Sequence, residues 1–317
     1  MMYIYTTCFG SFVFNEHFDL RDKILFRQSE ILKNFELIEQ KKETEAEKTL
    51  MQKYKSEKIT FGHEKFQKVM VYFRQHKDDF FEAAVLIARK KIKESVNEDL
   101  LIIQAIDNIF EINKAANLLS KRLVEWYSYY FPELIRQVND NESFAKIIVT
   151  KKKKEIIADL NIKDSIGSDI SHENLEPILK LAEEINSLFR LRQEQEKYLE
   201  TIISSYCKNL NYLVGPLIGA RLLAQAGSLK RLMLFPASTI QLLGAEKALF
   251  RHMRTGARSP KYGIIMQHSF VQDARKDIKG KAARALADKI SIAVKMDYFK
   301  GDFIAPKLRK ELEEKFR

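Results

Sequence analysis

Two long stripes of apolar residues at helical spacing constrain the fold of this chain more than any other feature. The first stripe recurs every three or four positions over about eight turns, at Leu101, Ala105, Ile109, Ile112, Ala116, Leu119, Leu123, Trp126 and Tyr130. The second stripe comprises Leu175, Leu179, Ala182, Ile185, Phe189, Leu199, Ile202 and Tyr206. Pro132 ends the first stripe, and Ser168 or Ser171 is expected to cap the second. A helix with one narrow seam cannot bury it alone. The stripes therefore pair as an antiparallel hairpin, or the hairpin pairs with another chain.

The positive charge of the chain is confined to its last third. Residues 215–317 contain 21 lysines and arginines against nine acidic residues, whereas residues 1–214 contain 33 and 34. The net charge of +11 therefore arises entirely in the C-terminal segment. A surplus confined to one segment is typical of a polyanion-binding face. Gly219, Gly227 and Pro236 punctuate this segment, which favours a compact module of short helices over a continued coiled coil.

Composition narrows the class of protein further. With 45% hydrophobic residues, 11 glycines and 6 prolines, the chain predicts a mainly helical protein with a real core. Its two cysteines, Cys8 and Cys207, form no disulfide framework, which indicates a reducing compartment. No apolar run approaches the roughly 20 residues of a membrane span, and the N-terminus lacks the pattern of a secretory signal. A cytoplasmic protein without a membrane partner is expected.

Residues 1–95 predict a small α/β domain. Residues 2–7 and 11–15 are rich in β-branched and aromatic side chains, so they are expected to form two strands joined by a turn at residues 8–10. From Lys65 onward the apolar spacing becomes helical. The many aromatic residues of this domain suit a core, and part of them would also suit a docking surface for another protein.

Four segments of the chain carry a resemblance to a known family. Residues 98–134, 213–229, 236–263 and 279–297 read EDLLIIQAIDNIFEINKAANLLSKRLVEWYSYYFPEL, LVGPLIGARLLAQAGSL, PASTIQLLGAEKALFRHMRTGARSPKYG and KGKAARALADKISIAVKMD. Together they resemble the Nop family of box C/D ribonucleoprotein scaffolds, a single protein in archaea and a pair of nucleolar proteins in eukaryotes. Residues 1–95 are more divergent, although MMYIYTTCFGSFVF suits the family's N-terminal domain. Eukaryotic members carry long charged tails and this chain does not, so the resemblance is to the archaeal protein.

The resemblance implies a division of labour along the chain. Residues 1–95 would bind fibrillarin, the methyltransferase that uses S-adenosylmethionine, so this chain would itself need no cofactor. The helices of residues 96–213 would pair two scaffold molecules through a coiled coil. The seam residues expected to mediate this self-association are Leu175, Leu179, Ala182, Ile185 and Phe189. Residues 214–305, the Nop domain, would bind a kink-turn guide RNA together with its small ribosomal-protein-like binder. The assembly would methylate RNA at the 2′-oxygen. From the residues alone, the short charged tail of residues 306–317 is expected to be an amphipathic helix or a frayed end, without a function of its own.

The start of one predicted helix suits contact with RNA. A helix beginning near Gly244 and Ala245 would direct free backbone N–H groups and its positive dipole end at a phosphate. Lys247 and Arg251 follow at a spacing of four, so they share one helical face. Glu246 is expected to hold Lys247 or Arg251, or to meet a basic residue of the protein partner.

The residues that follow complete the predicted RNA- and protein-binding site. Arg254 continues the same helical face, and Arg258 and Lys261 lie on a Gly-Ala-Arg-Ser-Pro loop that can approach a backbone closely. Gln267 and His268 can read base edges or the 2′-hydroxyl, and a neutral His268 can also stack on a base. Phosphate contacts of this kind give affinity without sequence information, so sequence choice would come from the RNA shape and the guide.

Other residues of the basic segments have plainer interpretations. Leu249, Phe250 and Met253 are expected to be core. The four lysines of residues 151–154 are expected to form a solvated helix face, with RNA contact as the alternative. Four further cations would serve either RNA contact or ordinary solubility: Arg275, Lys276, Lys279 and Lys281.

The sequence contains no signal of a catalytic site. It lacks a Gly-x-Gly-x-x-Gly after a strand, a Walker loop and Cys or His pairs at metal spacing, so the chain is expected to position a catalyst rather than to be one. Two alternatives remain open. One is the scaffold of another kink-turn particle, such as a spliceosomal one, and the other is a coiled-coil structural protein with a generic nucleic-acid-binding end. A eukaryotic member would be nucleolar.

Overall fold

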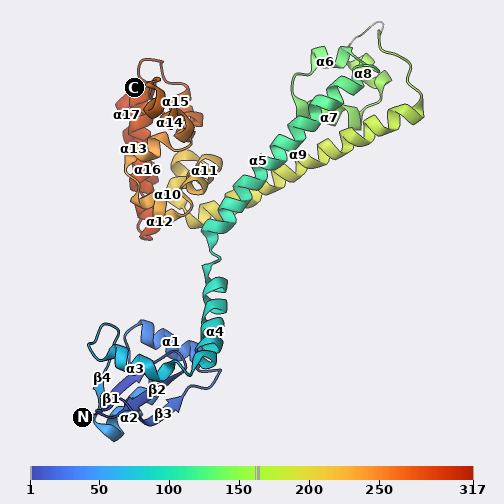
Figure 1. Cartoon of the computed structure of the whole chain (residues 1–317). Helices are drawn as coiled ribbons and strands as arrows, with labels where there is room; N and C mark the ends of the chain where they lie inside the picture. The colour runs from blue at the N-terminus through green and yellow to red at the C-terminus, as the bar shows by residue number, and fades with distance from the viewer. Residues whose placement is uncertain (1, 161, 163–164, 317) are drawn as a thin grey trace. The chain divides into compact units, whose positions relative to one another are not determined.

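Contacts within the chain divide it into two units, Met1–Val96 and Asn97–Arg317. The computed structural model describes residues 2–160, 162 and 165–316 (Figure 1). The first unit combines a small sheet with helices, and the described part of the second unit contains only helices. This confirms the predicted fold class, a mainly helical protein with an α/β N-terminal domain.

The N-terminal unit contains a four-stranded sheet in the order β3-β2-β1-β4. Its strands are β1 (Tyr3–Thr6), β2 (Gly10–Phe14), β3 (Leu20–Leu25) and β4 (Glu57–Lys58). The two predicted strands are β1 and β2, which pair antiparallel, and every residue of β2 is buried. The helices of the unit are α1 (Ile31–Glu39), α2 (Glu45–Tyr54), α3 (Phe66–Phe73) and α4 (Lys77–Ser95).

Aromatic side chains fill the core between this sheet and its helices. Phe73 of α3 lies 4.9 Å from Phe12 and 6.1 Å from Phe9, measured between ring centroids, and Phe80 lies 4.7 Å from Phe9. All three contacts are edge-to-face, the geometry that aromatic pairs prefer. The interpretation of these residues as core is therefore confirmed.

Two long helices dominate the second unit. They are α5 (Glu98–Tyr127) and α9 (His172–Tyr206), and they run side by side as an antiparallel hairpin (Figure 1). Three short helices lie between them in sequence and pack at the far end of the hairpin: α6 (Glu133–Gln137), α7 (Asn141–Thr150) and α8 (Lys153–Asp159). None of the helices in the described residues is long and apolar enough to cross a membrane.

The residues predicted for self-association pack inside one chain. Ala182, Ile185 and Phe189 of α9 are at most 3% exposed and belong to a core that also contains residues of α5 and α7. Leu175 and Leu179 pack against the edge of the same core. A second copy of the chain cannot contact the three buried side chains without opening the hairpin. These residues therefore form an intramolecular seam, and self-association stays a prediction that needs another surface.

The seam of α5 differs from the predicted stripe. Its buried residues include Ile102, Ile106 and Tyr127, whereas Leu119 and Trp126 are exposed by 37% and 40%. The reason is that α5 carries apolar residues on two faces, so periodicity alone does not choose between them. The exposed face is available to another molecule.

A lobe of short helices follows the hairpin. They are α10 (Lys208–Val214), α11 (Pro216–Ala226), α12 (Leu229–Leu234), α13 (Ala237–Leu242), α14 (Glu246–Thr255), η1 (Ile264–Gln267), α15 (Ser269–Gln272), α16 (Lys279–Tyr298) and α17 (Ala305–Phe316). The core of the lobe is centred on α16, whose buried alanines allow neighbouring helices to approach closely. Ile102 and Leu199 belong to the same core, so the base of the hairpin and the lobe pack as one body.

The predicted C-terminal tail is part of this lobe. Residues 305–316 form α17, and Ala305, Leu308 and Leu312 are at most 5% exposed. The prediction of a charged amphipathic helix is therefore confirmed, because the leucines at a spacing of four give an otherwise charged helix one apolar face.

A buried polar network joins three helices of the lobe. The Asp297 carboxylate accepts hydrogen bonds from the backbone N–H groups of Asn209 and Leu210 at 3.0 and 2.9 Å, and from the Asn209 amide at 2.9 Å. The Asn209 Oδ1 atom accepts from the backbone of Ile304 and Ala305 at 2.8 and 3.0 Å. The network satisfies N–H groups at the starts of α10 and α17, which would otherwise be buried without partners.

Alanine substitutions should distinguish the buried seam of the hairpin from the exposed face of α5. Ile185→Ala is expected to lower the free energy of unfolding by about 2–5 kcal/mol, because it leaves a cavity in a closely packed seam. Leu118→Ala, on the exposed face of α5, is expected to change it by less than about 0.5 kcal/mol. Urea unfolding followed by circular dichroism measures both. Equal effects would contradict the assignment of the faces.

Candidate nucleic-acid interface

One helix of the lobe contributes no side chain to any core. This helix, α14, and the loop after it form the α14 arm, residues 245–262, and none of the α14 residues is buried. Phe250 and Met253 are exposed by 62% and 72%, and Leu249 is only partly buried. The expectation that these three residues are core was wrong, because none of the other helices and strands that the structure describes covers that face of α14.

Hydrogen bonds at its base hold the α14 arm in place. The backbone N–H of Gly263 donates to the Gln241 carbonyl at 2.8 Å, and that of Ile264 donates to the Leu243 carbonyl at 2.7 Å. The Gln241 side-chain amide donates to the Lys261 carbonyl at 2.6 Å. The chain thus leaves the lobe after α13 and returns beside its own point of departure.

Two glycines allow this close return. Gly244 has a φ of +83°, and a Cβ atom there would lie 2.6 Å from the Ile264 side chain. A Cβ atom on Gly263 would lie 1.9 Å from the Leu243 carbonyl oxygen. Because both positions exclude any side chain, the geometry of the arm depends on glycine at each of them.

The predicted cations of α14 lie together on the arm. Lys247, Arg251 and Arg254 line a shallow hollow of about 440 Å³ with Phe250 and Thr255. No ion pair among the described residues involves any of these three cations. Unpaired cations beside uncovered apolar side chains form a surface that suits an anionic ligand and an apolar one together.

The remaining predicted loop cations extend this surface. Arg258 and Lys261 are both exposed, and neither takes part in an ion pair among the described residues. The loop is closed by a hydrogen bond between the His252 ring and the Ala257 carbonyl. Gly256, with a φ of +67°, ends α14 and turns the chain into the loop.

Glu246 has a different partner from those expected. Its Oε1 atom accepts a hydrogen bond from the backbone N–H of Gly244 at 2.7 Å, and no ion pair with Lys247 or Arg251 occurs among the described residues. The Glu246 carboxylate therefore stabilises the turn into α14 from the first helical position. Since it places negative charge at the helix start, this terminus is less suited to a phosphate than the sequence indicates.

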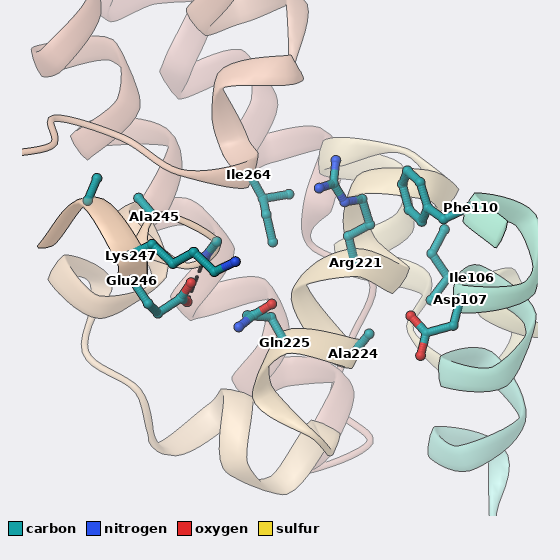
Figure 2. A pocket seen from close by; sticks show the side chains of 12 residues that line it. Ile106, Asp107, Phe110, Arg221, Ala224, Gln225, Ala245, Glu246, Lys247 and Ile264 are labelled. Atoms are coloured by element: carbon teal, nitrogen blue, oxygen red, sulfur yellow. Dashed lines mark hydrogen bonds between the residues drawn. The ribbon is translucent and has the colours of Figure 1, made fainter. Parts of the chain in front are cut away.

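Arg221 is a site residue that the sequence-based interpretation missed. Its guanidinium carbon lies 4.6 Å from the centroid of the Phe110 ring (Figure 2). Its Nη1 atom donates to Gln267 Oε1 at 2.6 Å. Burial lowers the pKa of Arg221. A signal was available in the sequence, since Arg221 is the one charged residue of the apolar segment PLIGARLLAQA. Gln267, predicted as an RNA contact, thus also orients this arginine.

Arg221 and the start of α14 line the same cavity. The cavity has a volume of about 810 Å³, and Figure 2 shows Arg221 beside Phe110 with Ile264, Glu246 and Lys247 across the hollow. The other residues that line it are Ile106, Asp107, Ala224, Gln225, Gly244, Ala245 and Ala248. The cavity therefore lies between the base of the hairpin and the start of the arm.

His268 does not belong to this surface. Its Nδ1 atom accepts a hydrogen bond from the backbone N–H of Phe270 at 3.2 Å, and its ring also bonds to the backbone of Leu213. Both bonds are internal, and His268 caps α15. The structure therefore gives His268 a structural role in the lobe, and its contact with RNA stays a prediction.

The basic start of α16 is partly neutralised within the chain. Arg275 lies 3.6 Å from Asp277, Arg284 lies 3.6 Å from Asp288, and Lys279 donates to a backbone carbonyl at 2.7 Å. Each of these cations has a local role, in contrast to those of the α14 arm. The α14 arm is therefore the stronger candidate for the anion-binding surface.

The lysine run of residues 151–154 is also used internally. Lys151 pairs with Asp159 at 2.6 Å. Lys153 donates to the Tyr130 carbonyl at 2.9 Å, and its ammonium lies 4.4 Å from the centroid of the Tyr130 ring. These contacts favour a structural role for Lys151 and Lys153 over an RNA-binding one.

The fold and this surface define a class of protein: a helical protein with unpaired cations on an exposed arm. Comparisons with known proteins agree. Residues 108–317 match the family model described as Nop, snoRNA binding domain, fibrillarin, and residues 1–99 match the archaeal Nop5/56-related N-terminal domain. The chain belongs to the Nop family.

Two curated relatives support this membership. An uncharacterized NOP5 family protein of Methanocaldococcus jannaschii is 41% identical over 246 residues, which are 72% of this chain and 59% of that protein. Nucleolar protein 56 of Homo sapiens is 37% identical over 252 residues, which are 72% of this chain and 42% of that protein. The chain thus spans about half the length of the curated relatives that it matches. A solved chain from a fibrillarin/Nop5p complex aligns with 99% of this chain and 100% of its own length, at 23% identity and a TM-score of 0.45.

The position of His268 predicts a pH dependence of stability. Burial holds the pKa of His268 below its ordinary value of 6.5 in the folded chain. The unfolded chain therefore binds the proton more readily, and stability is lost as the pH falls below about 6.5. His268→Gln is expected to show a smaller drop in Tm between pH 7.5 and pH 5.5 than the unsubstituted protein. Thermal unfolding at both pH values measures the difference, and identical drops would contradict the structural role of His268.

Proposed function

We propose that this chain is a non-catalytic scaffold of a box C/D guide ribonucleoprotein that directs 2′-O-methylation of RNA. In this role the lobe binds a kink-turn RNA together with a small ribosomal-protein-like partner, and the N-terminal unit recruits fibrillarin. S-adenosylmethionine is then bound by fibrillarin and not by this chain. The observation that carries the proposal is the α14 arm, which combines unpaired cations with uncovered apolar side chains.

The chemistry of the arm favours a ligand made of RNA and protein. RNA phosphates would neutralise Lys247, Arg251 and Arg254, but they offer no apolar surface to Phe250 and Met253. A protein partner would cover Phe250 and Met253, and it would leave the cations unpaired unless it were acidic. A ligand with both surfaces satisfies all five residues at once, as expected for RNA held by a small protein.

The N-terminal unit exposes apolar side chains that suit the fibrillarin partner. Phe61 and Phe81 are exposed by 89% and 70%, and Phe66, Met70 and Val71 line a shallow hollow of about 470 Å³. Large apolar residues at a surface are typical of protein docking. We therefore assign fibrillarin binding to this unit.

Self-association is assigned to the outer face of α5. Leu118, Leu119 and Trp126 are exposed, and Arg122 lies between them at helical spacing. We propose this face in place of the seam residues of α9, because those residues pack against α5 and α7 within one chain. Pairing of two hairpins through this face would cover the apolar side chains while each hairpin stays closed.

A gel-shift series tests the proposed function. The full chain is titrated into kink-turn RNA with and without the small partner, and into RNA that lacks the kink-turn. Strong dependence on both the partner and the kink-turn is expected. Equal binding to all RNAs, or to duplex DNA, would favour a coiled-coil protein with a generic nucleic-acid-binding end. Preference for a spliceosomal kink-turn over a box C/D one would favour the other particle. The archaeal cytoplasm is the proposed location, and the nucleolus would apply to a eukaryotic protein.

Substitution of the cations and of the apolar residues of the arm should affect the salt dependence of binding differently. Lys247→Ala with Arg254→Ala is expected to weaken the ternary complex and to reduce the slope of log K against log salt by about two units, one for each lost phosphate contact. Phe250→Ala with Met253→Ala is expected to weaken the complex without changing the slope, because no charge is lost. Binding of fibrillarin should be unchanged in both variants. An unchanged slope in the first variant would contradict phosphate contact.

Charge on the outer face of α5 should prevent self-association. Leu118→Asp with Trp126→Asp is expected to shift the chain toward the monomer in sedimentation experiments, since two carboxylates would lie in the contact between copies. The hairpin should stay folded, because both positions are exposed in one chain. An unchanged sedimentation coefficient with an unchanged circular dichroism spectrum would refute this assignment of the surface.

A further inference from the structure

We propose that the cavity between α5, α11 and the start of α14 receives one unstacked base of the bound RNA, and that this base stacks on Arg221. The inference rests on the proposed function, because the RNA must be held on the α14 arm to deliver a base. It adds a direct contact with a nucleobase to a surface that otherwise contacts phosphates and protein. The observation that points to it is an oriented, unpaired arginine that lines a cavity.

Arg221 is held in a conformation that suits stacking. Phe110 covers the guanidinium at 4.6 Å, and Gln267 Oε1 accepts from Nη1 at 2.6 Å, so contacts at two points fix the planar group. Both Arg221 and Phe110 line the cavity (Figure 2). Unstacked RNA bases commonly stack on aromatic rings and on guanidinium planes. Because Arg221 is already ordered in the free protein, its side chain loses little conformational entropy when a base stacks on it.

Partial burial of the Arg221 guanidinium costs hydration free energy in the free protein. No ion pair among the described residues involves Arg221, and burial lowers its pKa. A partly buried cation without a carboxylate partner loses hydration. The ring contact with Phe110 and the hydrogen bond to the neutral Gln267 amide compensate for only part of this loss. A ligand with a π face and acceptor atoms would compensate for the lost hydration.

The other polar groups of the cavity select a base over a phosphate. Asp107 and Glu246 offer carboxylate oxygens and Gln225 offers an amide, and all three line the cavity. A phosphate inside would meet these two carboxylates as well as Arg221 and Lys247, so the cavity gives it little net attraction. The exocyclic amines and ring nitrogens of a base match these acceptors and this amide. Lys247 also lines the cavity and lies at the start of the arm, where it suits the phosphate of the same nucleotide.

The same groups disfavour a side chain of the protein partner. A charged side chain of either sign would meet like charges as well as opposite ones, because two carboxylates and two cations line the cavity. A neutral planar group with hydrogen-bond donors and acceptors avoids both conflicts. The volume of about 810 Å³ accommodates a nucleotide, since small-molecule sites commonly measure about 300–1,000 Å³.

Abasic scanning of the RNA tests this inference. The full chain and the small partner are titrated into kink-turn RNAs that each lack one base, and gel shift gives the affinity of each complex. At one unpaired position, loss of the base is expected to weaken binding about tenfold. Arg221→Lys keeps the charge and loses the plane. It is expected to weaken binding of the intact RNA about tenfold, and to bind the sensitive abasic RNA as well as the unsubstituted protein does.

Two further variants control this experiment. Arg231→Lys, at an exposed position of α12 outside the cavity, should reproduce the unsubstituted profile. Phe110→Leu removes the ring behind the guanidinium and should weaken binding of the intact RNA by several-fold, again without effect on the sensitive abasic RNA. Circular dichroism and Tm should match the unsubstituted protein for all variants.

Three outcomes would overturn the proposal. A complex that forms normally but shows no sensitive base position would mean that no base enters the cavity. An Arg221→Lys variant that weakens every RNA equally, including each abasic one, would mean that Arg221 acts on the backbone or on the protein partner. If the unsubstituted chain forms no complex with the intact RNA and the small partner, the proposed function fails, and this inference fails with it.

Discussion

The candidate site depends on how the α14 arm is held. The α14 helix contributes no buried side chain, so its position is set by backbone hydrogen bonds at its base and by the space that Gly244 and Gly263 leave. A core helix keeps its place through apolar burial, whereas α14 leaves Phe250 and Met253 exposed. An arm anchored only at its base can present both Phe250 and the cations to a ligand.

Buried carboxylates give this arm a rigid platform. Asp297 ties α10 to α16, and Asn209 extends the connection to α17. Asp99 of α5 accepts from the backbone N–H of Leu229 at 3.1 Å, which joins the hairpin to the start of α12, and burial raises the pKa of this carboxyl. The cavity beside Arg221 has walls from both the hairpin and the lobe. It therefore exists only because these joints and the shared apolar core fix the two parts together.

Helical periodicity predicted the large elements well and the surface poorly. The hairpin of α5 and α9 follows from apolar stripes that are too long to remain unpaired, and the hairpin of β1 and β2 follows from β-branched and aromatic residues around a glycine turn. Periodicity failed on α5, where two faces are apolar, and on Phe250, because an apolar residue that awaits a partner resembles a core residue in sequence. Arg221 was missed because a ring contact with Phe110 and a hydrogen bond to Gln267, both distant in sequence, set its role. Its only local sign is a single charge in an apolar segment.

The exposed arm makes the unassembled chain vulnerable to proteases. Arg251, Arg254 and Arg258 offer trypsin cleavage sites on a segment that no core protects, and local opening of such a segment costs little. A cut there would leave the two ends joined through the backbone bonds between Gln241 and Gly263, so the nicked lobe would keep its shape while it lost its ligand surface. Assembly would conceal these sites, so resistance to digestion reports directly on whether the arm is occupied.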